Sequence, residues 1–142
     1  MSSCARLALG MALLAGIAPA TRAEANDGIE IVVAGETDSG GAAPSCALQI
    51  RLTNNGTSRI TVFTAELAAA DDRTGATLRV NSNTVPFMGV AAGTSKSWDN
   101  VTVSGAPCEQ VRLQVVNTVC SPRCPPVGWT NRGLAGIAQA RP

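Results

Sequence analysis

The chain has 142 residues, with 11 basic and 10 acidic side chains, a formal net charge of +1 and no histidine or tyrosine. The balanced charge, without a basic stripe, gives no electrostatic footprint for nucleic-acid binding. The missing imidazole excludes Ser-His-Asp and Cys-His catalysis and His-ligated zinc or copper sites. We therefore expect no enzyme, no cofactor and no nucleic-acid partner.

The N-terminal residues have the order of a secretory signal peptide. Arg6 is the only charge before the apolar run 7–20, which ends in small residues. A positive start, a short apolar run and a small-residue cleavage site define such signals. The run is shorter than the roughly 20 apolar residues of a membrane span. We expect a signal peptide over residues 1–23 and a periplasmic or secreted protein without a membrane span.

The chain after this signal is long enough for one domain with a modest core. From Glu24 onward it has nine basic and ten acidic side chains. Its length matches a single domain. We place this domain at residues 24–142, with a core over about residues 28–137.

Short segments in which apolar and polar residues alternate predict β-strands along the whole domain. Six such segments lie near residues 29–33, 48–53, 59–63, 78–80, 101–103 and 111–115, and residues 127–137 supply a seventh. Asn54-Asn55-Gly56 favours a hairpin between the second and third strands. Residues 65–70 have helical propensity, and we interpret them as the end of a strand running into a turn.

Short strands with turn residues at regular spacing favour a sandwich over a parallel α/β fold. The sequence thus predicts an all-β immunoglobulin- or fibronectin type III-like β-sandwich of about seven strands. In that order, residues 46–53 become strand B and residues 109–118 become strand F, facing each other across the core.

Four cysteines remain after the signal: Cys46, Cys108, Cys120 and Cys124. An even number in a small exported domain predicts disulfides, and their spacing alone leaves three pairings open. Because strands B and F begin at the same end of the sandwich, we prefer Cys46–Cys108 with Cys120–Cys124. The alternative pairs Cys46 with Cys120 and Cys108 with Cys124.

The segment Cys120-Ser-Pro-Arg-Cys124-Pro125 resembles the copper-binding loop of the thioredoxin-fold copper chaperones for cytochrome oxidase assembly. Two thiolates at this spacing hold a soft ion such as Cu(I). Those chaperones also use a distant histidine, which this chain lacks. A loop closed by its own disulfide is therefore the favoured interpretation, and a Cu(I)- or redox-handling site at Cys120 and Cys124 is the alternative.

Two further groups of residues are weaker candidates for a site. Oxygen ligands for calcium are offered by Asp71, Asp72, Asp99 and Asn100. The surrounding turn-like sequence favours the interpretation that these are solvated turn residues. Trp98 and Trp129 are candidates for interface anchors or for core and edge positions. We find no two carboxylates spaced to share a catalytic cleft.

Residues 44–124 resemble the small secreted fibronectin type III-like proteins of the interleukin receptor mimic (IrmA) family. The shared features are Cys46 before a strand, the Asn54-Asn55-Gly56 turn, Gly93 before a strand, and Cys108 and Cys120 around the next one. The resemblance implies an exported cytokine-receptor-like sandwich that acts by protein contact. We therefore expect a non-enzymatic module that binds another protein, with a homodimer through strand edges as a further expectation.

Overall fold

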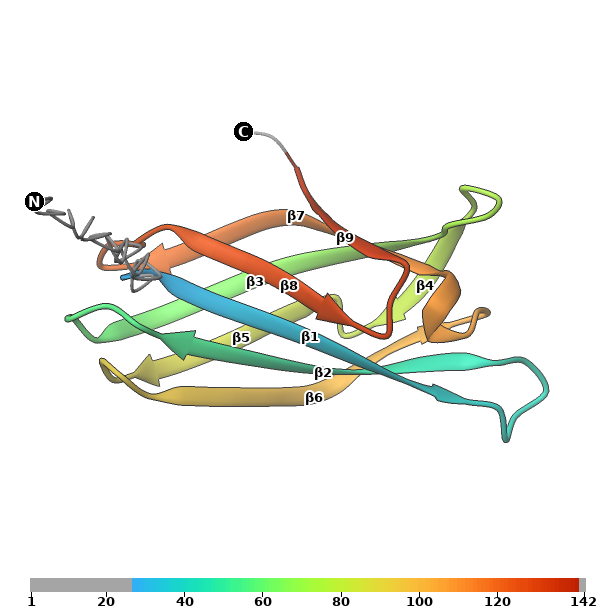
Figure 1. Ribbon diagram of the computed structural model, residues 1–142, viewed down its shortest axis with the longest axis horizontal. Coiled ribbons are helices and arrows are strands. Elements are labelled where there is room, and N and C mark those ends of the chain that lie inside the picture. Colours follow the sequence, from blue (N-terminus) through green and yellow to red (C-terminus); the bar gives the residue numbers. More distant parts are fainter. Residues whose placement is uncertain (1–26, 141–142) are drawn as a thin grey trace, which may run out of the picture.

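The computed structural model describes residues 27–140, which form nine strands and one short 3-10 turn (Figure 1). The signal peptide expected at residues 1–23 lies outside these residues. The elements are β1 (Ile29–Asp38), β2 (Ser45–Asn54), β3 (Ile60–Asp71), β4 (Thr77–Asn81), β5 (Thr84–Val90), β6 (Ser95–Ser104), η1 (Cys108–Gln110), β7 (Val111–Ser121), β8 (Val127–Arg132) and β9 (Gly136–Gln139). The all-β class is confirmed, with nine strands where about seven were expected.

The strands missing from the sequence prediction have identifiable causes. Strand β5 was not predicted because Pro86 and Gly89 interrupt its alternation. Residues 65–70, expected to end a strand, lie within β3, where Ala65, Leu67 and Ala69 are buried at every second position. The expected seventh strand is divided into β8 and β9 by a turn containing Gly133, whose φ of 78° suits glycine.

The strands form one nearly closed sheet in the order β8-β1-β2-β6-β4-β3-β7-β9, with β5 also paired to β3. Figure 1 shows β1, β2 and β6 on one side of the molecule and β3 and β7 on the other. Strand β4 joins the two sides, because its first residues pair with β3 and Arg79 to Asn81 pair with β6. At the other side β8 pairs parallel with β1, and β9 pairs parallel with β7.

The expected hairpin at Asn54-Asn55-Gly56 is wrong. Strand β2 pairs with β1 and β6, whereas β3 pairs with β4, β5 and β7, so the segment carries the chain from one side of the sheet to the other. Asn54 is buried and bonds to other parts of the chain. The Asn55-Gly56 pair thus lies in a crossing segment and not in a hairpin turn.

The interior is an aliphatic core with one pair of aromatic rings, Phe63 and Phe87, whose centroids are 6.4 Å apart. Partly buried hydrophobic side chains flank this core, namely Leu78, Val80, Trp98, Cys120, Val127, Trp129, Leu134 and Ile137. Both tryptophans therefore pack against the core instead of standing free as surface anchors. The indole Nε1 of Trp98 is buried without a hydrogen-bond partner.

The two sides of the sheet are joined covalently where β1 comes close to a disulfide. Cys46, near the start of β2, is bonded to Cys108 in η1, and both are buried. Gly35 on β1 lies directly against this bond: a Cβ there would approach the Cys108 Sγ to 2.9 Å and a Leu134 methyl group to 2.7 Å. Glycine is thus required at this position by close approach, with no positive φ involved.

We expect Gly35→Ala to lower the free energy of unfolding by about 1–3 kcal/mol, the usual cost of overpacking. Urea unfolding under non-reducing conditions measures this loss. Gly41→Ala is the control, because its Cβ would meet only a backbone oxygen at 3.5 Å in an exposed loop. Equal losses in the two variants would contradict close packing at Gly35.

Candidate functional site

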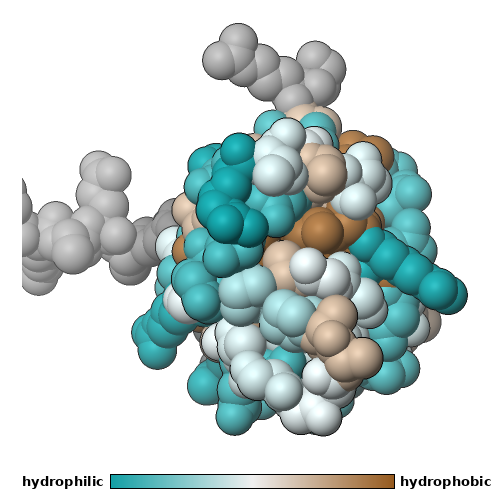
Figure 2. Space-filling view, turned by 90° about the vertical axis from the view of Figure 1, so that its right-hand side faces the viewer, coloured by the Kyte–Doolittle hydropathy of each residue, from teal (hydrophilic) through white to brown (hydrophobic). Residues whose placement is uncertain are grey.

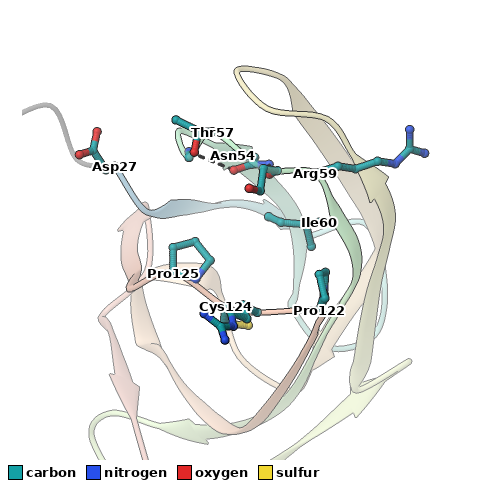
Figure 3. Close-up of a pocket in the computed structure, with 11 residues that line it drawn as sticks. Asp27, Asn54, Thr57, Arg59, Ile60, Pro122, Cys124 and Pro125 are labelled. Atoms are coloured by element: carbon teal, nitrogen blue, oxygen red, sulfur yellow. Dashed lines mark hydrogen bonds between the residues drawn. The ribbon is translucent and has the colours of Figure 1, made fainter.

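An open depression of about 520 Å³ lies at the end of the molecule where β2 ends and β8 begins. We call it the loop depression and define it by Asp27, residues 54 and 56–60 of the β2–β3 connection, and residues 122–125 of the β7–β8 connection. Figure 3 shows Pro122, Cys124 and Pro125 opposite Asn54 and Thr57. Its walls are therefore two loops that each connect the two sides of the sheet.

Asn54 holds the first wall in place. Its side-chain Nδ2 donates to the carbonyl oxygens of Ser58 at 2.8 Å and Val90 at 3.1 Å, and its Oδ1 accepts from the Gly56 amide at 3.0 Å. Its backbone bonds to Thr94 and Gly93 in the β5–β6 turn. With only 1% of its surface exposed, this one amide links three segments of the chain.

The second wall is closed by the Cys120–Cys124 disulfide, whose Cα atoms are 5.5 Å apart. The Ile29 amide donates to the carbonyl oxygen of Pro126 at 2.9 Å, which ties this loop to the start of β1. In contrast to the buried Cys46–Cys108 pair, Cys124 is exposed. Both preferred disulfide pairings are thus present, and they brace opposite ends of the sheet.

The lining of the loop depression mixes apolar and charged groups. Pro122 and Pro125 supply apolar surface beside the almost fully buried Ile60, and Asp27, Arg59 and Arg123 supply charges around it. The Arg59 side chain extends away from the centre of the depression (Figure 3), and its guanidinium lies near Gly89 of β5. The loop depression thus combines apolar contact surface with charge at its periphery, as protein interfaces with an apolar centre and a polar rim do.

The candidate calcium residues are not brought together. Asp71 Oδ1 accepts from the backbone amides of Arg73 and Thr74, and Asp72 pairs with Arg112 at 2.7 Å, so each has a local partner in the fold. Asp99 and Asn100 are exposed on β6, where its register with β2 shifts. Within residues 27–140, no three Cys, Asp or Glu side chains are placed to hold a metal ion.

The opposite end of the molecule carries the β1–β2 and β3–β4 turns. Figure 2 shows this end as a mostly hydrophilic surface around a small hydrophobic area. The β3–β4 turn is held locally by Asp71 and by the Asp72–Arg112 ion pair. Substitutions in the turns at this end lie far from the loop depression and can serve as controls for substitutions in it.

Comparison with protein-family models, with curated proteins and with solved structures finds no match to this chain. Along residues 27–140 the structure contains no helix that is long and apolar enough to cross a membrane.

Sequence reasoning named Cys120 and Cys124 but missed Asn54 and the loop depression. Asn54 ends a strand in which alternate residues Leu48, Ile50 and Leu52 face the interior. The same alternation puts position 54 on the inner face. A polar residue at an inner position is a signal for a buried hydrogen-bonding role, and that signal was available from the sequence.

We expect Asn54→Ala to reduce the free energy of unfolding by about 2 kcal/mol, because it leaves buried backbone groups without partners. Urea denaturation gives the value. Asn55→Ala is the control, since the Asn55 side chain is exposed and only its backbone amide bonds, to Gly28. A loss no larger than that of the control would argue against Asn54 as the link between the three segments.

The two disulfides should differ in their contribution to stability. The Cys46–Cys108 bond spans 62 residues and the Cys120–Cys124 bond spans 4. In the chain-entropy account these loops correspond to about 4 and about 2 kcal/mol. We expect Cys46→Ala/Cys108→Ala to lower the unfolding free energy more than Cys120→Ala/Cys124→Ala. The reverse order in thermal or urea unfolding would refute this assignment of roles.

Proposed function

We propose that this chain is an exported, non-enzymatic module that binds another protein in the periplasm or outside the cell. In this proposal the fold is a disulfide-braced sandwich of the immunoglobulin or fibronectin type III kind, related to the interleukin receptor mimic family. The positions of β1, β2 and β6 on one side and of β3 and β7 on the other support it, because they correspond to strands A, B, E and C, F of that architecture.

The loop depression is the observation that carries the binding proposal. Its two walls are separate connections between the two sides of the sheet, and each has its own brace: the Asn54 hydrogen bonds on one wall and the Cys120–Cys124 disulfide on the other. Loops held on a rigid scaffold are where β-sandwiches place recognition surfaces. Because the walls are already ordered, a partner loses little entropy in fixing them.

A second candidate is a Cu(I)- or redox-handling role for the same loop. The exposure of Cys124 favours it, since an accessible disulfide can exchange with an external dithiol. Reduction would have to open the disulfide before the thiolates could hold a copper ion. This role and protein binding therefore require opposite oxidation states of Cys120 and Cys124.

A comparative capture experiment tests the binding proposal. The mature protein is immobilised in oxidised form and exposed to an envelope extract of the producing cell. We expect a bound protein species that is lost with Thr57→Arg/Arg123→Glu, because both side chains are exposed on the loop depression. The matched control Ser39→Arg/Arg73→Glu makes the same changes in exposed turns at the opposite end and should retain it.

Loss of the species in both variants, or in neither, would contradict a binding site at the loop depression. The same samples, alkylated without reductant and analysed by mass spectrometry, separate the two candidates. Alkylated Cys120 and Cys124 with bound copper would favour metal handling over protein binding.

A further inference from the structure

Among the described residues, the nearly closed sheet has an opening between β7 and β8. Strand β9 pairs with β7 only from Arg112 to Val115, and its last bond runs from the Ala140 amide to the Val115 carbonyl. Beyond this point, among the described residues, β7 from Val116 to Ser121 pairs with β3 alone, and β8 pairs with β1 alone. We call the space between these two edges the open seam.

Strands β7 and β8 border the open seam from its two sides. The loop of residues 122–126 joins them at one end, and the turn of residues 133–135 joins β8 to β9 at the other. Figure 1 shows the two strands with their arrowheads pointing in opposite directions. A strand placed in line with β9 would therefore run parallel to β7 and antiparallel to β8.

At the open seam the edge of the hydrophobic core is not fully covered by other strands. Cys120, Val127 and Trp129 are only partly buried against the core, and all three lie along this opening. Thr118 pairs with the buried Ala65 and so faces inward, yet it is exposed. The inner face of the sheet is therefore left uncovered at this part of β7.

The edge of β7 lacks charge and proline, two of the features that usually prevent pairing with another chain. Residues 116–121 contain no charge and no proline, whereas natural edges are protected by such residues. Val119 is 56% exposed and Val116, the extra residue of a bulge opposite Glu66 and Leu67, is 45% exposed. Exposed apolar side chains and unpaired backbone groups thus coincide on the same six residues.

We propose that the open seam binds an extended segment of a partner protein, about six residues long, by strand addition in line with β9. The segment has apolar side chains at every second position, which cover the inner margin at Cys120, Val127 and Trp129. A peptide segment brings a single strand with no sheet of its own beside it. A second copy of this chain would have to bring its own β7 edge, which is flanked by its own β8.

The inference deepens the proposed function and rests on it, because the open seam ends at the Cys120–Cys124 loop that forms one wall of the loop depression. A partner segment lying in the open seam would reach Pro122 and Pro125 with its C-terminal end. Loop contacts and strand pairing would then belong to one binding surface.

The test uses the purified full mature protein and a fluorescein-labelled octapeptide of alternating threonine and valine. We expect saturable binding by fluorescence anisotropy. We also expect amide hydrogen exchange in residues 116–121 and 127–132 to slow by about tenfold or more on peptide addition, as for newly formed edge hydrogen bonds. An octapeptide with N-methylated backbone amides at alternate positions is the probe control, because it keeps the side chains and loses donors.

The protein control compares the exposed valines of the β7 edge with Met88, an exposed apolar residue on β5. Val116→Lys/Val119→Lys places charges on the β7 edge and should weaken binding by about tenfold or more. Met88→Lys on β5, where Met88 is 57% exposed, should leave binding unchanged. Thermal unfolding of both variants checks that the fold is retained.

Three results would overturn the inference: no saturable binding of the octapeptide, equal effects of the two lysine variants, or protection at β5 instead of β7. Protection of residues 116–121 that rises with protein concentration in the absence of peptide would assign the open seam to a second copy. Because the peptide experiment needs no cellular partner, it can fail while capture at the loop depression succeeds, and the reverse also holds.

Discussion

The separation of the two sides of the sheet is set where the Cys46–Cys108 disulfide lies against the backbone of Gly35. At this point β1, β2 and the segment before β7 come within van der Waals contact. The turn between β8 and β9 sits at the same place, since a Cβ on Gly133 would lie 3.0 Å from the Gly35 carbonyl oxygen. Because of this close packing, the chain can pass from β8, which pairs with β1, directly into β9, which pairs with β7. A bulkier residue at either glycine would push apart the strands that close the sheet.

The two ends of the molecule are held by different kinds of interaction. One end depends on a buried covalent bond packed against apolar atoms. The other depends on Asn54, whose side chain links the ends of β2 and β5 and the start of the β2–β3 connection through hydrogen bonds. Buried amide networks of this kind specify one arrangement because every group has a partner. The loops that we propose for binding thus keep a defined shape while remaining at the surface.

The sequence predicted those parts of the fold in which side-chain alternation is unbroken. Strands around residues 29–33, 48–53 and 111–115 were found because an inner apolar residue follows each outer polar one. Strand β5 was missed because Pro86 and Gly89 hide the period, although Val85, Phe87 and Val90 are buried. The pairing of Cys46 with Cys108 could be inferred from strand positions, but no local pattern reveals Gly35, which is needed only because of what packs on it.

The candidate site was less predictable than the fold for the same physical reason. The loop depression joins residues near positions 57 and 123, which local sequence patterns do not connect. The Asn55-Gly56 pair suggested a hairpin because turn statistics are local, whereas the partners of β2 and β3 are set by strands far away in the sequence.

The parallel pairing of β1 with β8 has a consequence for the order of folding. Ile29 lies opposite Val127, 98 positions later in the chain. Such distant pairing carries a large loop-closure entropy and forms slowly. During synthesis the first strand can pair with β2 early, but its other edge stays open until the last strands have emerged. The sheet can therefore close only after its C-terminal strands have been synthesised. A process that must thread the unfolded chain can act until that moment.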